Sequence, residues 1–275
     1  MRIYCINSDN SNISNKEEFS LMDIKGDIRN LRKPITLDMQ KVHLDCASCD
    51  ARSISFLKHC TPEQVEKINK VKSCVHYKKG QVIFYEDNLA QGIYCLSAGV
   101  VKLVKSSEDG REQIIRFSQR GEFLGYRALI SEEPFVASAE CVEDSVACFI
   151  PRDTFLDVLA QNPRINLEMM KSLCHELGIA DEKIASLAHK SVRERLAETL
   201  IVLHDTFKDS GKHNEEEEMI HIALPREDIA NIVGTATETL IRLLSEFNKE
   251  GLIELQGKRI KLLNIQKLEK IASMA

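Results

Sequence analysis

The sequence lacks the features of several protein classes. No stretch approaches the roughly 20 consecutive apolar residues that a bilayer-spanning helix needs, so a membrane protein is not expected. The N-terminus, MRIYCINSDNSNISNKEE, has no apolar core of a signal peptide, and the chain is therefore expected to stay in the cytoplasm. The formal net charge is −5, so the chain has no overall positive charge that would by itself indicate nucleic-acid binding.

Signatures of enzymes are also missing. The strand-like segments contain no His-x-His pair, which a metal site of the cupin type would need. The chain has no phosphate-binding loop and no nucleophile–base motif of the usual kinds. We therefore do not expect an enzyme. Nine cysteines in a cytoplasmic protein indicate free thiols, or a metal or cluster site, rather than a disulfide framework.

The most informative segment is PREDIANIVGTATETLIRLLSEFNKEGLIELQGKRI, near the C-terminus. Pro225 is suited to a helix start, and Gly234 is suited to a helix end. Thr235 or Thr237 is expected to cap a second helix, and a two-stranded wing follows around Gly257. The apolar stripe of the second helix consists of Leu240, Leu243, Leu244 and Phe247. The pattern predicts a winged helix-turn-helix.

The other face of the second helix carries side chains suited to DNA. In such a unit this helix lies in the major groove, where Arg242 can donate to guanine and Glu238 can accept from cytosine. These two residues can also pair with each other as an i,i+4 ion pair. The helix residues are expected to contact bases, and the wing residues are expected to contact DNA phosphates. These residues are Thr237, Glu238, Ile241, Arg242, Ser245, Lys258 and Arg259. Further phosphate contacts are expected from Lys190, Arg193, Arg195 and Lys261.

The middle of the chain has the pattern of a small β domain followed by a long helix. Strands are expected at 82–85, 93–96, 100–104, 113–117 and 146–150, separated by glycines. In the helical stretch, apolar residues recur at alternating spacings of three and four, as in a coiled-coil seam between two copies. The alternative is an amphipathic helix that covers the β domain. The seam residues are Met170, Leu173, Leu177, Ala180, Ile184 and Leu187.

The chain resembles the Crp/Fnr family of bacterial transcription regulators from about Cys46 to Leu263. The recognition-helix motif of that family is matched by TETLIRLL, and its β-roll is matched by phrases such as KKGQVIFYEDN and DGREQIIRFSQRGEFLGYRALI. The resemblance implies an α+β fold with a β-roll (double-stranded β-helix) like a cyclic-nucleotide-binding domain. It also implies a homodimer that binds palindromic double-stranded DNA and contacts RNA polymerase. Ile241 departs from the polar residue of the FNR branch, so a different half-site is expected.

The resemblance also bears on the effector. The cyclic AMP-binding branch uses a Glu after a GEFLG-like motif and an Arg-Ser pair, whereas this chain has Tyr126 and Ala137-Ser138 there. Without the arginine, a bound phosphate would lose its bidentate partner, so cyclic AMP is not expected. The residues expected to line the corresponding pocket are Gly125, Tyr126, Arg127, Ala137 and Ser138.

The FNR branch holds a [4Fe–4S] cluster on four cysteines, with a C-x2-C-x5-C motif. Here Cys46 and Cys49 match the first pair, Cys60 follows after a longer gap, and Cys148 matches the fourth position. The alternatives are a core role for Cys148, a thiol switch at Cys46 and Cys49, haem, or another small ligand.

These observations predict a DNA-binding transcription regulator that an effector or a redox change controls. The expected parts are a polar extension (1–40), a sensor (41–162), a dimerisation helix (163–190) and the winged helix-turn-helix (191–275). The competing classes are a cupin-like enzyme and a cyclic-nucleotide-binding module that acts on a protein. The latter would leave the helix-turn-helix unexplained.

Overall fold

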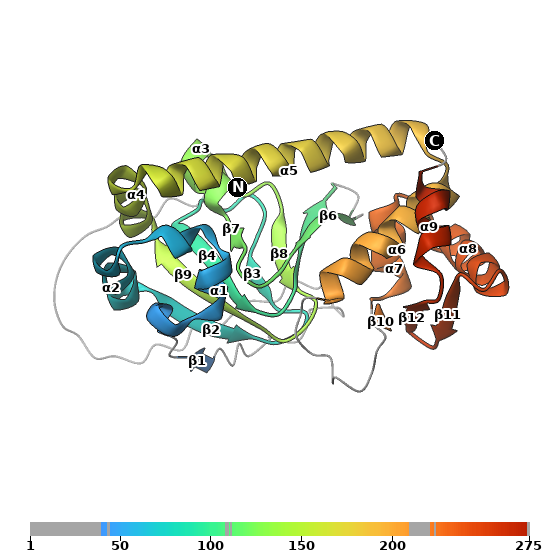
Figure 1. The fold of residues 1–275 in the computed structure, drawn as a ribbon, viewed down its shortest axis with the longest axis horizontal. Helices are drawn as coiled ribbons and strands as arrows, with labels where there is room; N and C mark the ends of the chain where they lie inside the picture. The colour runs from blue at the N-terminus through green and yellow to red at the C-terminus, as the bar shows by residue number, and fades with distance from the viewer. Residues whose placement is uncertain are drawn as a thin grey trace, which may run out of the picture. The chain divides into compact units, whose positions relative to one another are not determined.

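A computed structural model describes residues 40–42, 45–107, 110, 112–208, 221–222 and 224–273. The polar extension predicted for residues 1–40 lies, except for its last residue, outside this part of the chain. The described residues form an α+β fold in which a β-roll is followed by a long helix and a helical C-terminal domain, as predicted (Figure 1). Among them, no helix is both long and apolar enough to cross a membrane.

Two antiparallel sheets form the β-roll. The first has the strand order β1-β2-β9-β4-β7, and the second has the order β3-β8-β5-β6. The first sheet consists of β1 (Gln40–Val42), β2 (Ser73–Tyr77), β9 (Ser145–Pro151), β4 (Gly92–Ala98) and β7 (Phe123–Leu124). The second consists of β3 (Val82–Phe84), β8 (Ser138–Cys141), β5 (Val101–Ser106) and β6 (Glu112–Ser118). The five strands expected from the sequence overlap β3, β4, β5, β6 and β9.

The inward-facing side chains of the roll explain why these segments pair. Ile93, Val101, Ala139 and Ile150 come from both sheets and are fully or almost fully buried. Burial of such side chains stabilises the roll by about 1.5–3 kcal/mol for each large one. The β4–β5 turn needs Gly99, whose φ is +89° and whose missing Cβ would lie 2.2 Å from Ser145 Oγ.

Short helices precede the roll and cover one side of the first sheet. Thr61 begins α2 with a capping box, since its hydroxyl accepts from the Gln64 N–H and the Gln64 side chain accepts from the Thr61 N–H. The elements are η1 (Cys46–Ser48), α1 (Asp50–Ile54), η2 (Phe56–His59) and α2 (Pro62–Val71). They place three cysteines beside the sheet.

The helical part begins at the end of β9. A short helix, α3 (Tyr126–Ser131), lies within the roll, and α4 (Arg152–Gln161) leads into the long helix α5 (Pro163–His189). Asn162 caps α5, and Pro163 occupies its first turn, where a missing N–H has no cost. The C-terminal domain consists of α6 (Val192–Lys208), β10 (His221–Ile222), α7 (Arg226–Val233), α8 (Thr237–Lys249), β11 (Ile253–Gln256), β12 (Arg259–Leu262) and α9 (Ile265–Ala272).

Candidate nucleic-acid interface

A tight turn joins α7 to α8. Gly234 ends α7 in the left-handed conformation, with φ 71°, and its N–H donates to the Ala230 carbonyl at 2.9 Å. The Thr235 N–H donates to the same carbonyl at 3.1 Å, so Thr235 belongs to the end of α7. The N-cap of α8 is Ala236, which offers no side-chain acceptor, and Thr237 already lies inside the helix. The prediction that Thr235 or Thr237 caps α8 was therefore wrong.

The apolar stripe predicted for α8 forms the core of the C-terminal domain. Leu240, Leu243, Leu244 and Phe247 are all buried, together with Ile229 of α7. Such a stripe fixes the rotation of α8 about its own axis, because turning the helix would expose these side chains to water. The opposite face of α8 is thereby directed outward.

The outward face of α8 carries the predicted base-reading residues. Glu238, Ile241, Arg242 and Ser245 are exposed, and Thr237 is half-buried. The Ser245 hydroxyl donates to the Ile241 carbonyl at 3.0 Å, one turn earlier. The structure therefore places the predicted residues on one accessible helix face, and their contacts with bases stay a prediction.

Arg242 does not pair with Glu238. Its guanidinium donates to Glu246 Oε1 at 2.7 Å, four residues later in α8, and the Arg242 side chain stays 64% exposed. Exposed i,i+4 pairs contribute only about 0.3–0.5 kcal/mol, so DNA can displace this one at little cost. In the described part of the chain Glu238 has no ion-pair partner.

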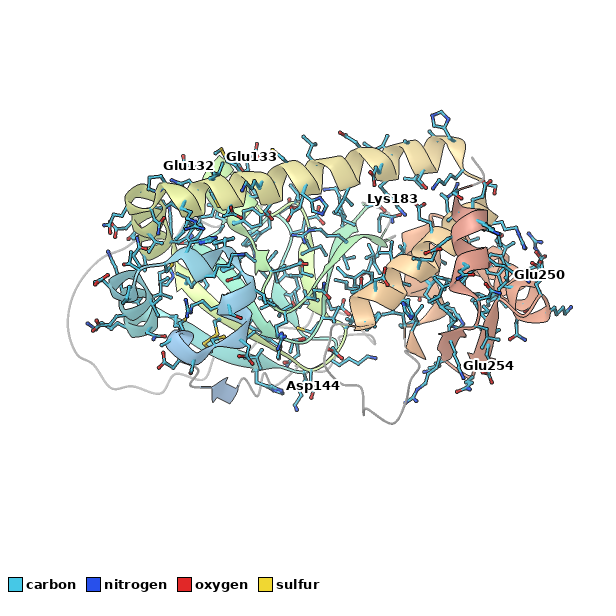
Figure 2. The ribbon with its side chains drawn as sticks, viewed as in Figure 1. Glu132, Glu133, Asp144, Lys183, Glu250 and Glu254 are labelled. Atoms are coloured by element: carbon cyan, nitrogen blue, oxygen red, sulfur yellow. A yellow bond between two sulfur atoms is a disulfide. The ribbon has the colours of Figure 1, made fainter. Side chains whose placement is uncertain are left out.

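The basic residues at the start of α6 have structural contacts. Arg195 Nε donates to the Val233 carbonyl at 2.9 Å, and the same guanidinium reaches the Gly234 carbonyl at 3.3 Å, so Arg195 holds the α7–α8 turn. Arg193 lies over the Phe247 ring and donates to Glu250 at 2.6 Å. Figure 2 labels Glu250 in the C-terminal domain. Both arginine side chains therefore have contacts within the domain, as does Lys190, which pairs with Glu198 at 3.2 Å. The phosphate contacts expected for these three residues stay a prediction.

The wing exposes two cations. In the β11–β12 hairpin Lys258 and Arg259 are exposed, whereas Lys261 pairs with Glu254 at 3.6 Å. Arg226 at the start of α7 donates to the Gly257 and Lys258 carbonyls at 3.1 and 3.4 Å. Arg226 therefore ties the wing tip to the helix-turn-helix, a role that only the fold reveals, because 31 residues separate it from Gly257.

The long helix α5 exposes an apolar stripe. Leu177 and Ile184 are 63% and 67% exposed, and Leu167 and Met170 are about half exposed. Of the six predicted seam residues, Met170, Leu177, Ala180, Ile184 and Leu187 are exposed, but Leu173 is half-buried against the core of the roll. Assigning Leu173 to the seam was wrong, because Ile165, Met169 and Leu173 turn toward the roll. The exposed stripe with heptad spacing is Leu167, Met170, Cys174, Leu177, Asp181 and Ile184.

The structure places the residues predicted for an effector pocket in different surroundings. Arg127 is exposed and Ala137 is buried, while the Ser138 hydroxyl accepts from the Glu86 N–H at 3.0 Å. Tyr126, next to Gly125, is buried, and its hydroxyl donates to Glu176 Oε1 of α5 at 2.6 Å. Burial and this hydrogen bond raise the pKa of Tyr126.

Half-buried paired charges lie beside Tyr126. Arg116 lies 3.3 Å from Glu176 and 3.2 Å from Glu122. Burial raises the pKa of Glu122, although Arg116 opposes this shift. A guanidinium already held by two carboxylates is a poor partner for a phosphate, since binding would leave both carboxylates without their counter-ion. The Arg116 network therefore disfavours a phosphate beside Tyr126, and the lining of an effector pocket stays a prediction.

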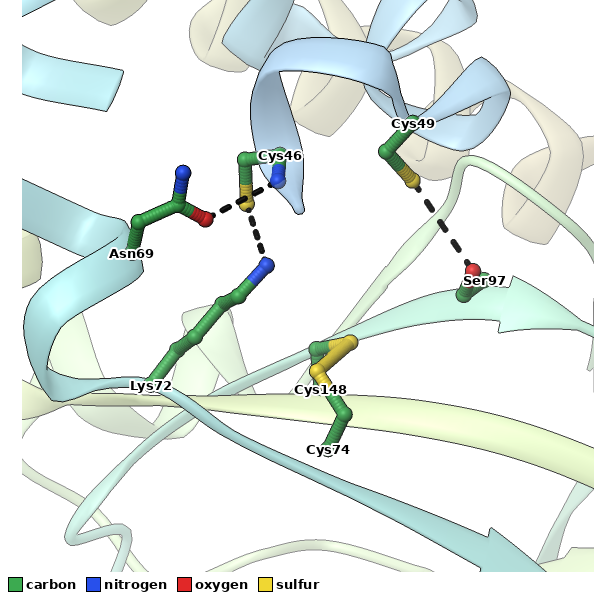
Figure 3. The surroundings of a disulfide bond; sticks show 7 residues. All are labelled: Cys46, Cys49, Asn69, Lys72, Cys74, Ser97 and Cys148. Carbon is green, nitrogen blue, oxygen red and sulfur yellow. Dashed lines mark hydrogen bonds between the residues drawn. A yellow bond between two sulfur atoms is a disulfide. The ribbon is translucent and has the colours of Figure 1, made fainter. Parts of the chain in front are cut away.

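The predicted cluster ligands lie near one another, but they do not form a ligand set. Cys148 is joined to Cys74 in a disulfide, which contradicts the expectation that the cysteines are free thiols (Figure 3). Cys46 Sγ accepts from Lys72 Nζ at 2.9 Å. Cys49 Sγ lies 3.9 Å from Ser97 Oγ.

A [4Fe–4S] cluster does not fit these residues. It would need four converging thiolates, and Cys148 has no thiolate while it is bonded to Cys74. Burial raises the pKa of Cys60 to about 11, which disfavours its thiolate form. No group of three or more Cys, His, Asp or Glu side chains suited to a metal occurs among the described residues.

Taken together, α7, the turn, α8 and the wing define a winged helix-turn-helix DNA-binding protein, and a β-roll precedes this domain in the chain. Residues 74–162 match the family model of the cyclic nucleotide-binding domain, and residues 194–271 match that of the Crp-like helix-turn-helix domain.

Known proteins agree with this class. The chain is 31% identical to the regulatory protein HlyX of Actinobacillus pleuropneumoniae, over 82% of this chain and 92% of that protein. It is 30% identical to the fumarate and nitrate reduction regulatory protein of Escherichia coli K12, over 83% and 90% of the two chains. Among solved structures, FixK2 from Bradyrhizobium japonicum is 26% identical and has a TM-score of 0.64, over 74% of this chain and 99% of FixK2. The chain belongs to the Crp/Fnr family and is a DNA-binding transcription regulator.

Proposed function

We propose that the chain binds a two-fold symmetric double-stranded DNA site as a homodimer, with one α8 helix in the major groove of each half-site. The observation that carries this proposal is the outward face of α8, where Glu238 and Arg242 are exposed over a fully buried apolar stripe. Lys258 and Arg259 of the wing would contact phosphates, which position the helix without reading the sequence.

The proposed DNA site can be identified without knowledge of the target genes. Selection of binding sites from a random duplex pool should return a palindrome whose half-sites are about 34 Å apart, the length of one DNA turn. Recovery of duplexes with a single half-site would contradict the two-fold arrangement. Recovery of no sequence preference would contradict base reading by α8.

The proposed dimer is supported by the exposed stripe on α5. Exposed apolar residues at coiled-coil spacing, interrupted here by Asp181, are costly in water and are typical of a helix that packs against its own copy. In a parallel pair of α5 helices, Leu177 and Ile184 would face the same residues of the second chain. The resemblance further implies that the DNA-bound dimer contacts RNA polymerase, and this stays a prediction.

We infer that neither cyclic AMP nor an iron–sulfur cluster is the resident effector. The support is the Arg116 network beside Tyr126 and the bond between Cys74 and Cys148.

The cluster alternative has a direct test. Protein purified without oxygen should be colourless and should contain no stoichiometric iron or acid-labile sulfide, because the four cysteines do not present four thiolates. The measurement is a visible absorption spectrum together with iron and sulfide assays. A brown sample with four iron and four sulfide ions per chain that bleaches in air would overturn this inference, and it would leave the DNA-binding proposal intact.

A further inference from the structure

Three cysteines form a row across the first sheet. Cys74 of β2 is directly opposite Cys148 of β9, and Cys148 is directly opposite Cys95 of β4. Residues directly opposite each other in antiparallel strands project to the same face of a sheet. All three side chains are buried in one cluster, and the Cys74–Cys148 disulfide joins two of them.

The C-x2-C segment covers this face of the sheet. Cys46 and Cys49 both lie close enough to Cys95 for their charges to raise its pKa, and Cys49 Sγ lies 3.9 Å from Ser97 Oγ, at the β-bulge of β4. Cys46 belongs to the same buried cluster as Cys74, Cys95 and Cys148. Figure 3 shows Cys46 and Cys49 in the surroundings of the disulfide. A dithiol therefore lies beside a disulfide.

Cys46 is held at three atoms. Its N–H donates to Asn69 Oδ1 at 2.9 Å, and its carbonyl accepts from Arg52 Nε at 2.6 Å. Its sulfur is 2.9 Å from Lys72 Nζ, at the junction of α2 and β2. The sulfur of Cys46 is therefore held against a cation, and thiol–disulfide exchange proceeds by attack of a cysteine sulfur on a sulfur of the disulfide.

The neighbouring free thiols have surroundings that disfavour the thiolate form. Burial raises the pKa of Cys95 to about 12 and that of Cys60 to about 11. Cys49 faces a shallow cavity of about 370 Å³, which Ser97 and Arg120 also line. Cys46 is therefore the thiol next to a cation, Lys72, and Cys49 is the thiol that lines the cavity open to solvent.

We propose that Cys46 and Cys49 exchange with the Cys74–Cys148 disulfide and so form the redox-active site of the sensor. The Cys46 thiolate attacks one sulfur of the disulfide, and the electron pair of the broken S–S bond leaves with the other sulfur. The Cys49 thiolate then attacks Cys46, which forms a Cys46–Cys49 disulfide and releases the second strand cysteine as a thiolate. The two thiol protons of Cys46 and Cys49 end on Cys74 and Cys148, so the exchange needs no external oxidant or reductant.

The exchange would let a dithiol in solution reduce the buried Cys74–Cys148 disulfide indirectly. The Cys74–Cys148 bond is buried, with 5% and 6% exposure of the two residues, so a small dithiol in solution reaches it poorly. The exchanged Cys46–Cys49 bond would lie at the shallow cavity, where a dithiol can attack it. Oxidation of the core thiols would follow the same route in reverse.

The rate of reduction tests this route. Full-length protein with the Cys74–Cys148 bond intact is treated with dithiothreitol, quenched with acid and N-ethylmaleimide, and digested with trypsin. Mass spectrometry then follows the labelling of the peptide that contains Cys74, which is 73–78, or 71–78 in Lys72→Met. In Cys46→Ser the rate should fall by about tenfold or more, and in Lys72→Met by a smaller factor. The matched control Cys60→Ser should keep the wild-type rate. Equal rates in wild type and Cys46→Ser would overturn the proposal. Misfolding cannot imitate the expected result, because unfolding exposes the disulfide and speeds its reduction.

A trapping variant identifies the intermediate. In Cys49→Ser the second step is blocked, so limited reduction should accumulate a mixed disulfide that joins peptide 42–52 to peptide 73–78 or 128–152. Fragmentation distinguishes Cys148 from Cys141 within the longer peptide. A mixed disulfide between Cys95 and Cys148, with Cys46 always free, would assign the exchange to the cysteine row itself and contradict the role of Cys46.

Discussion

Arg242→Ala is expected to remove the preference for one base pair in each half-site while the protein stays folded. A bidentate contact between arginine and guanine contributes about 1–3 kcal/mol of discrimination, which corresponds to roughly fivefold to more than a hundredfold in affinity per half-site. The fold should tolerate the change, because the Arg242 side chain is 64% exposed and its partner Glu246 also lies 3.7 Å from Arg193. The measurement is fluorescence anisotropy with the selected palindrome and with each single-base variant of it.

The control for this prediction is Arg259→Ala in the wing. A phosphate contact carries no sequence information, so this variant should weaken binding to all duplexes by a similar factor and reduce the salt dependence by about one unit of slope. If Arg242→Ala behaves like Arg259→Ala, Arg242 is a phosphate ligand and the reading role moves to another residue on the exposed face of α8.

Leu177→Glu is expected to convert the dimer into monomers and to abolish high-affinity binding to the palindrome. Leu177 is 63% exposed in a single chain, so the substitution should leave the monomer folded. In the dimer it would remove one large apolar side chain from each copy, about 1.5–3 kcal/mol apiece, and would place two carboxylates close together. We expect the dissociation constant of the dimer, measured by analytical ultracentrifugation, to rise at least about a hundredfold.

Ile179→Glu is the matched control for Leu177→Glu. Ile179 is also exposed, at 51%, and lies two residues further along α5, on roughly the opposite side of the helix. The same charge there should leave the dimer and its DNA affinity unchanged. A Leu177→Glu protein that remains dimeric, or loss of the dimer in both variants, would contradict pairing through the α5 stripe.

The local sequence pattern was sufficient to predict the helix-turn-helix. The stripe Leu240–Phe247 was predicted because apolar residues at helical spacing indicate a buried face wherever the helix packs. Gly234 was predicted as a helix end because only glycine adopts a positive φ there without strain, and its φ is 71°. The cap of α8 was predicted wrongly, because a threonine beside a helix start does not reveal whether its backbone completes the preceding helix.

Contacts between residues far apart in the chain could not be predicted from the sequence. The strands β2, β7 and β8 were not expected, since two to five residues carry little periodic signal and their pairing depends on strands far away in the chain. Arg195 and Arg226 looked like free cations, yet their guanidiniums satisfy backbone carbonyls of the turn and the wing. The same holds for Arg116, which the sequence did not indicate and which joins β6 to α5 through Glu176.

By itself, the sequence determined the order of the elements, the class of the DNA-binding domain and the family, because these depend on local periodicity, turn residues and a short recognition motif. Only the tertiary structure showed which polar side chains have hydrogen-bond or ion-pair partners within the protein. In the fold Leu173 packs against the roll, because the surface beside a helix determines which of its faces is buried. The exposed stripe of α5 therefore differs from the seam predicted from the sequence. The tertiary structure also brought together Cys74 and Cys148, which are 74 residues apart, because sheet register and not sequence spacing determines which cysteines meet.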